Sequence, residues 1–257
     1  MIARRALVTG ASRGIGRAVA LELGRRGFSL ALSSRSAADL AETAQMIEVA
    51  GTGKPSLHQC DLSRREESAR LVERACEGGA NIDVLVHVAG IAPSSKSTET
   101  ADPDWDMAME VNATAAFVLC RAALPHMIHQ QWGRIVVVAS TAGRIGYPYT
   151  AAYTASKHAV VGLVRALAVE HARHGVTVNA ACPGFTETNL LDEAVRNIVN
   201  RAGVTPEEAR RRLAAMSPQQ RLIQPDEVAE LVGFLVSEEA GSINGQAINI
   251  DGGAVTA

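Results

Sequence analysis

Short runs of β-branched and apolar residues alternate with longer helical patterns along almost the whole chain. The strand-like runs are A-L-V-T (6–9), F-S-L-A-L (28–32), S-L-H-Q-C (56–60), V-L-V-H-V (84–88), R-I-V-V-V-A (134–139), V-T-V-N-A (176–180) and Q-A-I-N-I (246–250). The helical patterns between them cover 15–26, 36–50, 63–77, 105–130, 151–174 and 226–236. Strands that alternate with helices form βαβ units, in which helices join parallel strands and cover the sheet. The chain is therefore predicted to be an α/β protein with a doubly wound, parallel, seven-stranded sheet and helices on both faces.

Length and composition favour one domain, predicted over 1–257. With 47% hydrophobic residues in 257, the chain can bury a large core within the size range of a single α/β domain. The segment 185–224 delays the last strand by two polar, partly helical stretches. An insertion of that length inside a compact domain is typical of a lid over a binding site.

Charge and cysteine content argue against several classes of function. The formal net charge of −2 provides no basic field for nucleic acid or for an anionic membrane, so neither partner is expected. The first residues lack the long apolar segment of a signal peptide, and no apolar run has the roughly 18 residues of a membrane span, which predicts a cytoplasmic protein. No C-x-x-C pair is present, so four cysteines are interpreted as buried thiols and no metal site is expected: Cys60, Cys76, Cys120 and Cys182.

The first strand leads directly into T-G-A-S-R-G-I-G, residues 9–16, and then into a helix. Gly10, Gly14 and Gly16 let the backbone turn tightly and approach a pyrophosphate, which would lie against the amide groups and positive end of that helix. Their spacing, G-x-x-x-G-x-G, differs from the general dinucleotide pattern, and a glycine-rich segment can be simply a turn. The position between the first strand and the first helix favours the dinucleotide site.

Two arginines indicate which dinucleotide is bound. An NAD site usually has an acidic residue at the end of the second strand for the ribose 2′-hydroxyl, but here that place reads S-S-R-S, residues 33–36. Arg35, with Arg13 from the glycine turn, offers cations that would hold a 2′-phosphate. Either arginine can instead be a solvated surface residue. We predict NADP(H), with NAD(H) as the second choice.

Three motifs follow one another at characteristic separations: the glycine turn 9–16, S-x12-Y-x3-K formed by Ser140, Tyr153 and Lys157, and P-G at 183–184. Together they resemble the short-chain dehydrogenase/reductase family over essentially the whole chain. R-I-V-V-V-A-S, Y-T-A-S-K, C-P-G-F-T-E-T and I-N-I-D-G-G are most similar to 3-oxoacyl-thioester reductases and polyketide ketoreductases. The resemblance implies a Rossmann-type domain, hydride transfer between a nicotinamide and a ketone or secondary alcohol, and a homotetramer formed through the two long helices and the C-terminal strand.

Ketone reduction explains the value of a tyrosine and a lysine four residues apart on one helical face. The alkoxide that hydride transfer leaves needs a proton, and a phenol with a pKa of roughly 10 is a reluctant acid or base. The Lys157 ammonium and the oxidised nicotinamide would both lower the pKa of Tyr153, the predicted proton donor. By resemblance, Lys157 also binds the nicotinamide ribose and Ser140 hydrogen-bonds the substrate carbonyl. Asn112 matches the fourth catalytic member, whose backbone carbonyl holds a relay water.

The resemblance also implies a set of cofactor contacts. Asp61 would contact the adenine, although it can also cap the helix that starts near Ser63. Thr186 and Thr188 would contact the nicotinamide carboxamide. The predicted contacts are Gly10, Ser12, Arg13, Gly14, Ile15, Gly16, Arg35, Asp61, Leu62, Ala89, Gly90, Tyr153, Lys157, Pro183, Gly184, Thr186 and Thr188. One departure is H-V-A-G at 87–90, where the family usually has N-N-A-G. The first asparagine normally ties neighbouring strands together by side-chain hydrogen bonds. His87 can do part of that and Val88 cannot, which puts local strand pairing and some ribose contacts in doubt.

The substrate pocket is expected beneath the lid, lined by Ile145, Tyr147, Phe185, Leu190 and Leu191. A 3-oxoacyl thioester of coenzyme A is the preferred substrate. The basic run Arg210, Arg211 and Arg212 could meet its phosphates, but a solvated helix face explains the run more simply.

Docking of an acyl carrier protein is only partly supported. Gln131 and His174 stand where carrier-protein reductases tend to have basic residues, and Arg134 and Arg173 lie nearby. Alternatives are a polyketide ketoreductase and an alcohol, sugar or hydroxyacyl dehydrogenase that uses NAD. A different class of function is a non-catalytic protein that senses NADP(H), disfavoured because all four catalytic residues are present.

Overall fold

The computed structural model describes residues 4–77 and 81–256, so the first and last residues of the predicted domain lie outside the described part. The described strands form one sheet in the order β3-β2-β1-β4-β5-β6-β7, with every neighbouring pair parallel. The strands are β1 (Arg5–Thr9), β2 (Ser29–Ser34), β3 (Ser56–Gln59), β4 (Val84–His87), β5 (Gly133–Val138), β6 (Val176–Pro183) and β7 (Ala247–Ile250). The predicted doubly wound, seven-stranded parallel sheet is confirmed.

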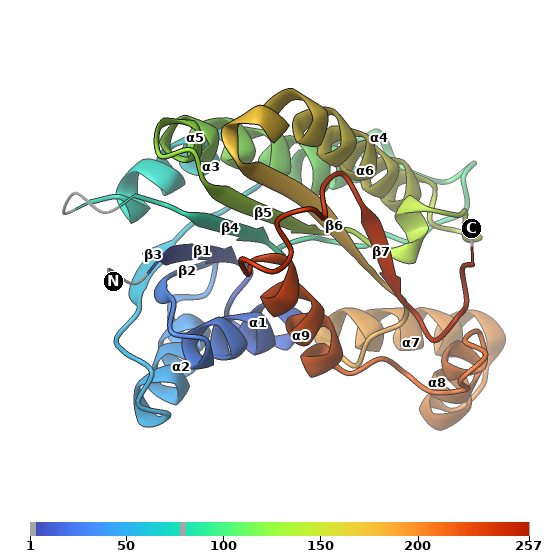
Figure 1. The fold of residues 1–257 in the computed structure, drawn as a ribbon. Coiled ribbons are helices and arrows are strands. Elements are labelled where there is room, and N and C mark those ends of the chain that lie inside the picture. Colours follow the sequence, from blue (N-terminus) through green and yellow to red (C-terminus); the bar gives the residue numbers. More distant parts are fainter. Residues whose placement is uncertain (1–3, 78–80, 257) are drawn as a thin grey trace.

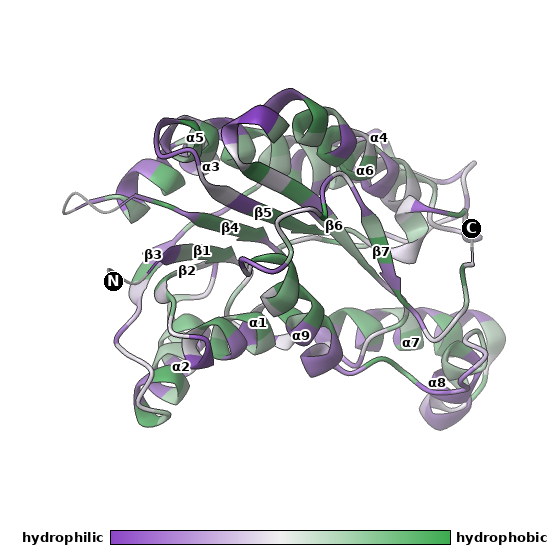
Figure 2. Cartoon of the chain, viewed as in Figure 1, coloured by the Kyte–Doolittle hydropathy of each residue, from purple (hydrophilic) through white to green (hydrophobic). Residues whose placement is uncertain are grey.

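Helices cover both faces of the sheet (Figure 1). On one face lie α1 (Gly14–Arg25), α2 (Ala37–Val49) and α9 (Pro225–Leu235); on the other lie α3 (Arg65–Ala75), α4 (Asp102–Ala108), α5 (Ala115–His129) and α6 (Ala151–His171). Short 3-10 helices, Thr141–Gly143 and Ala172–His174, follow β5 and α6. The strands are the most apolar layer, and the purple, hydrophilic residues gather on the helices and loops (Figure 2).

Alternate side chains of the central strands pack in two separate hydrophobic cores, one on each face of the sheet. In β1, Ala6 and Val8 pack in the core under α1 and α9, whereas Leu7 packs in the core under α3, α5 and α6. All three side chains are fully buried. A strand with a helix layer on each side is apolar on both faces, which is why the runs that predict these strands are nearly continuous rather than alternating.

The long helical pattern at 105–130 is not a single α-helix. It consists of the end of α4, a π-helix at Met109–Thr114 and α5. A π-turn accommodates an extra residue without breaking the helix, so hydrophobic periodicity cannot reveal it. The whole helical stretch Asp102–His129 has a segment long and apolar enough to cross a membrane, with 56% of that segment buried inside the protein. It packs as a core helix between α3 and α6.

The segment predicted to be a lid contains α7 (Asn189–Ala202) and α8 (Pro206–Ala214), which project beside the carboxyl ends of the strands (Figure 1). These helices have a small core of their own, formed by Leu191, Val195, Ala209 and Leu213. The lid helices are therefore held mainly by each other, and their role as a lid stays a prediction.

The turn before β6 is expected to tolerate no side chain. Gly175 has φ +70°, and a Cβ there would lie 2.3 Å from the carbonyl oxygen of Gln131. Gly203 has a similar φ of +65° with nothing within 4 Å of a Cβ. We expect Gly203→Ala to lower the free energy of unfolding by about 1 kcal/mol, for the left-handed backbone alone. Gly175→Ala should lower it by about 2 to 4 kcal/mol, because overpacking is added. Equal losses in urea unfolding would contradict this account.

Candidate active site

The turns after β1 and β4 meet at the point where the strand order reverses, which is where open α/β sheets bind ligands. Gly10 has φ +67°, and a Cβ there would lie 2.8 Å from the backbone nitrogen of Ala89. A Cβ at Gly16 would lie 2.0 Å from the carbonyl oxygen of Gly10. Glycine is thus required at both places for the turn to fold tightly over the start of α1. The role of this turn as a pyrophosphate cradle stays a prediction.

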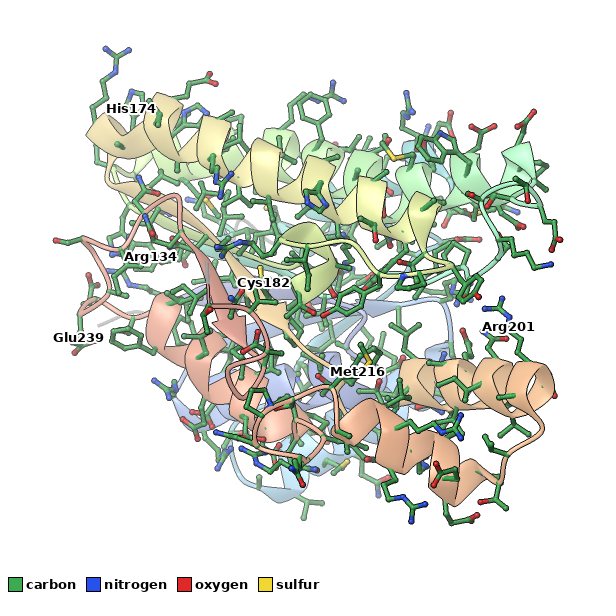
Figure 3. The ribbon with its side chains drawn as sticks, turned by 90° about the vertical axis from the view of Figure 1, so that its right-hand side faces the viewer. Arg134, His174, Cys182, Arg201, Met216 and Glu239 are labelled. Atoms are coloured by element: carbon green, nitrogen blue, oxygen red, sulfur yellow. The ribbon has the colours of Figure 1, made fainter. Side chains whose placement is uncertain are left out.

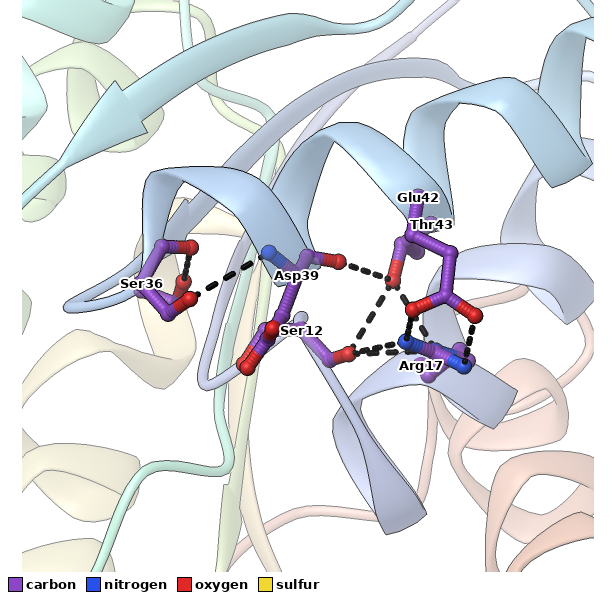
Figure 4. A network of polar contacts seen from close by, with 7 residues as sticks. Ser12, Arg17, Ser36, Asp39, Glu42 and Thr43 are labelled. Atoms are coloured by element: carbon purple, nitrogen blue, oxygen red, sulfur yellow. Dashed lines mark hydrogen bonds and ion pairs between the residues drawn. The ribbon is translucent and has the colours of Figure 1, made fainter.

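A polar network fixes this turn to α2 (Figure 4). The Arg17 guanidinium donates to the carbonyl oxygen of Ser12 at 2.6 Å and to Thr43 Oγ1 at 3.0 Å. Its charge is paired with Glu42 at 2.9 Å. Sequence reasoning did not identify Arg17, because its role depends on a helix that lies 26 residues further on. The network holds the backbone of Ser12 in place, next to Arg13.

Arg13 and Arg35 are both exposed, and neither has an ion-pair partner among the described residues. Arg35 lies close enough to Asp61 to act on its charge. Burial acts to raise the pKa of Asp61, but hydrogen bonds from Ser63 and the charge of Arg35 outweigh burial and lower it. Asp61 Oδ1 accepts from the Ser63 amide at 3.1 Å and from its hydroxyl at 2.8 Å. These bonds close a turn ahead of α3, whose N-cap residue Arg64 has no side-chain cap, so the helix-capping interpretation of Asp61 is wrong. Leu62 is buried in the core, which leaves only its backbone for a ligand.

The four predicted catalytic residues come from three elements: Asn112 from the π-helix, Ser140 from the end of β5, and Tyr153 and Lys157 from α6. The Ser140 hydroxyl lies close enough to Tyr153 to lower the pKa of the phenol. Lys157 Nζ donates to the carbonyl oxygen of Val138 at 3.0 Å and lies 5.7 Å from the centroid of the Tyr153 ring. These residues therefore form one polar group at the carboxyl edge, in which Asn112 and Lys157 are buried and Ser140 and Tyr153 are partly exposed on the cavity wall.

The side chain of Asn112 hydrogen-bonds to two different segments of the site. Its Oδ1 accepts from the Ile91 amide at 2.9 Å, and its Nδ2 donates to the Ile91 carbonyl and to Ser156 Oγ, both at 2.9 Å. The side chain thus joins the segment after β4 to the catalytic helix α6. The water-holding role of its backbone carbonyl stays a prediction.

Burial sets the protonation of the catalytic pair. Burial raises the pKa of Tyr153 above its ordinary value, and the nearby Ser140 hydroxyl only partly opposes this. Burial likewise lowers the pKa of Lys157 to about 8. In the protein alone, loss of hydration therefore governs the pKa of Tyr153. The lowering of this pKa by the Lys157 ammonium and the oxidised nicotinamide together stays a prediction. At neutral pH Tyr153 is a phenol with a proton to donate.

His87 takes over the strand bonding that the departure from N-N-A-G had put in doubt. Its Nδ1 lies 2.9 Å from Thr9 Oγ1, which also accepts from the Val88 amide at 3.2 Å. Either Thr9 Oγ1 or His87 Nδ1 can be the donor in this contact, depending on the imidazole tautomer. Burial, and then the charge of Lys157, lower the pKa of His87 to about 3, so the ring is neutral. β1 and β4 stay tied beside the cofactor turn.

A cavity of about 680 Å³ opens between this catalytic group and the lid helices. Four of the five predicted lining residues are on its wall, namely Tyr147, Phe185, Leu190 and Leu191, whereas Ile145 is not. The rings of Tyr147 and Phe185 meet edge to face at 6.0 Å between centroids. Sequence reasoning missed further lining residues, which no short motif marks: Tyr149, Arg201 and Met216. Arg201 and Met216 both face the space above the lid helices (Figure 3).

The predicted nicotinamide contacts lie on the same wall. Ile15, Gly90, Pro183, Gly184 and Thr186 line the cavity with Ser140, Tyr153 and Lys157. Thr188, at the start of α7, packs against the glycine turn, since its Cγ2 lies 3.1 Å from where a Cβ on Gly14 would be. The glycine turn, Tyr153 and the cavity are therefore continuous, which is the arrangement that a nicotinamide and a ketone need for hydride transfer.

Fold and site together define a nicotinamide-dependent oxidoreductase. Residues 4–213 match the family model of the short chain dehydrogenases, and the chain belongs to that family. It is an NAD(P)-dependent enzyme that acts on alcohol and ketone groups.

Relatives extend over nearly the full length. A protein of Streptomyces coelicolor that carries the name ketoacyl reductase is 38% identical over 250 residues, 96% of this chain and 95% of its own. A D-beta-hydroxybutyrate dehydrogenase of Cupriavidus necator is 36% identical over 98% of each chain. The crystal structure of a variant of actinorhodin polyketide ketoreductase with NADPH superimposes with a TM-score of 0.94 at 37% identity, covering 98% of this chain and 97% of that one.

Burial of the Lys157 ammonium should destabilise the fold in a pH-dependent way. Its pKa in the folded protein is about 8, below the ordinary 10.5. Below pH 8 both states carry the proton, so the folded state bears the whole penalty; between pH 8 and 10.5 the unfolded state binds more protons, so stability rises with pH. We expect the unfolding free energy of Lys157→Met, relative to wild type, to fall by about 3 kcal/mol from pH 7 to 10.5. A difference independent of pH in chemical unfolding would contradict the lowered pKa.

Proposed function

We propose that this protein is an NADPH-dependent reductase that converts the ketone of a 3-oxoacyl thioester, with a polyketide-type acyl chain, into the 3-hydroxyacyl form. The observation that carries the proposal is that Ser140, the protonated Tyr153 and Lys157 lie together on the wall of a mainly apolar cavity. The bound nicotinamide would supply the hydride.

The residues of the site have separate tasks in this reaction. The Ser140 hydroxyl donates a hydrogen bond to the ketone oxygen, where negative charge develops. The phenol of Tyr153 gives its proton to the same oxygen as the alkoxide forms, since a buried phenol is a better acid toward an adjacent alkoxide than water is. Lys157, fixed by the Val138 carbonyl, supplies positive charge behind Tyr153 and stabilises the resulting phenolate.

The proposal of NADPH over NADH rests on Arg13 and Arg35. Both guanidiniums are exposed beside the turn and the end of β2, without acidic partners among the residues described. A 2′-phosphate would make charge-assisted bonds to them. The NADPH in the similar ketoreductase structure supports the same preference.

The cavity favours an acyl chain over a small polar substrate. Its wall is formed mainly by aliphatic and aromatic groups, and apolar surface of that kind binds by exclusion of water. The similarity to a polyketide ketoreductase supports a chain of this class. A second candidate is oxidation of a 3-hydroxy acid, favoured by the likeness to D-beta-hydroxybutyrate dehydrogenases.

Arginines that the sequence offered for the phosphates of coenzyme A, and one offered for carrier docking, are used elsewhere. Arg210 is paired with Glu187 and Asp192, and both Arg211 and Arg212 are paired with Glu208. The solvated helix face is therefore the better interpretation of this run than a phosphate site. Arg134 is only 4% exposed and donates to backbone carbonyls, so its expected part in carrier docking is wrong.

The homotetramer and the cytoplasmic location stay part of the proposal. Exposed apolar side chains on the long helices, among them Phe117 of α5 and Val169 of α6, support an assembly through these helices. Val169 is 83% exposed, which is unusual for a valine in a long amphipathic helix.

Tyr153→Phe tests the catalytic assignment. We expect kcat for reduction of acetoacetyl-coenzyme A to fall by about 10² to 10⁴, because the proton donor is lost. NADPH binding, followed by fluorescence titration, should be retained. Tyr149→Phe removes a hydroxyl from the same cavity and should leave kcat within about twofold. Wild-type protein that binds NADPH but does not oxidise it with any ketone would favour the non-catalytic alternative.

Arg13 and Arg35 are expected to set the cofactor preference. The double variant Arg13→Ala, Arg35→Ala should lower the ratio of kcat/KM for NADPH to that for NADH by about 100-fold, since charge-assisted bonds to the 2′-phosphate disappear. Arg64→Ala, an exposed arginine paired with Glu67, is the matched control and should leave the ratio unchanged. A wild-type enzyme with the higher kcat/KM for NADH would overturn the NADPH assignment.

A further inference from the structure

One cation besides the catalytic lysine lines the substrate cavity. Within the described part of the chain, the charged side chains on the cavity wall are Lys157 and Arg201, and no acidic residue is on that wall. Lys157 is buried at the catalytic end, whereas Arg201 belongs to the last turn of α7 and is exposed. Figure 3 shows Arg201 between the lid helices and the part of the protein on the opposite side of the cavity. A positive charge is thus fixed at the solvent end of an otherwise apolar pocket.

The guanidinium of Arg201 is held in a defined orientation. Its Nη2 donates to the carbonyl oxygen of Ser94 at 3.0 Å, with Nη1 at 3.4 Å from Ser94 Oγ. Its Cζ lies 4.7 Å from the centroid of the Tyr149 ring, so the planar group rests on an aromatic face. Ser94 and Tyr149 also line the cavity, on the side opposite the lid helices. An arginine has five N–H donors, and these contacts use two, which leaves three for a ligand.

Arg201 differs from the basic run of α8. Arg210 is paired with Glu187 and Asp192, and Arg211 and Arg212 share the carboxylate of Glu208. Arg201 has no carboxylate partner among the described residues, and its contacts are a carbonyl, a hydroxyl and a ring. Its full positive charge therefore acts on whatever occupies the cavity mouth. A guanidinium with free donors favours an oxyanion, which it can bind in a bidentate way.

We propose that Arg201 is a specificity-determining residue that binds an oxyanion of the substrate, while the ketone lies at Ser140 and Tyr153. The inference rests on the proposed function, since it concerns the same cavity. The oxyanion is either the carboxylate of a free 3-oxo acid or the phosphate of a pantetheine thioester, which share the chemistry that an arginine recognises. Because the guanidinium is already fixed by Ser94 and Tyr149, little conformational entropy is lost when the anion binds.

Two pairs of ketones test the proposal. Acetoacetate is compared with its methyl ester, and the acetoacetyl thioester of pantetheine 4′-phosphate with that of pantetheine. We expect Arg201→Ala to raise KM for at least one charged member by about 10- to 100-fold and to leave KM for its neutral partner within about twofold. The charged member affected identifies the source of the oxyanion. Arg201→Lys keeps the charge without the bidentate geometry and should give an intermediate KM.

Arg196→Ala is the control, because Arg196 is an exposed arginine of the same helix that does not line the cavity. It should leave all four KM values unchanged. Equal changes of KM for charged and neutral members in Arg201→Ala would overturn the proposal, since Arg201 would then only fasten the lid to Ser94.

A binding measurement separates failure of this inference from failure of the proposed function. Calorimetric titration of the NADPH-loaded protein with acetoacetate and with pantetheine 4′-phosphate needs no turnover. If wild type reduces none of the four ketones, the proposed function fails. Arg201 still stands as an anion site if Arg201→Ala weakens the binding of one anion at least tenfold. If neither anion binds more tightly to wild type than to Arg201→Ala, the inference is wrong whatever the activity.

Discussion

The site depends on the close approach of two turns at the point where the sheet reverses its strand order. A Cβ on Gly10 would lie 2.8 Å from the amide nitrogen of Ala89, so the turns after β1 and β4 can meet only through glycine. The tie between Thr9 and His87 fixes the same two strands just before they end. This contact aligns α1 behind the cofactor turn and brings the segment after β4 to Asn112, which braces α6 and with it Tyr153 and Lys157.

Three titratable side chains lie around this contact, with His87 and Lys157 buried and Tyr153 half-buried, and loss of hydration shifts the pKa of each toward its neutral form. The pKa of Tyr153 is raised, while those of His87 and Lys157 are lowered. A neutral imidazole beside Lys157 avoids a second buried cation, and a neutral phenol is the form that reduction consumes. An apolar core of the same shape would be more stable, so the site retains polar groups at the expense of stability.

Local patterns predicted the sheet, its helices and most of the site, because these features depend on residues close in sequence. The glycine turn 9–16 and the spacing of Ser140, Tyr153 and Lys157 are local in this sense. The features that the sequence did not predict depend on contacts between residues far apart in the chain. Arg134 carries a charge that marks a surface residue, yet carbonyls of Gly133, Gly175 and Ser237 enclose it. Arg201 gains meaning only when folding brings Ser94 and Tyr149 opposite it. No periodicity distinguishes the π-helix that carries Asn112 from the α-helix on either side.

The separate core of the lid has a consequence for the evolution of this protein. Leu191, Val195, Ala209 and Leu213 pack on one another, outside the two large cores that hold the sheet. Exposed and cavity-facing positions of α7 and α8 can therefore change without disturbing the strands that position the cofactor turn. Selection can alter which ketones are accepted while the catalytic residues remain in register. A fold built in this way can give rise to a large family that shares one reaction and differs in its substrates.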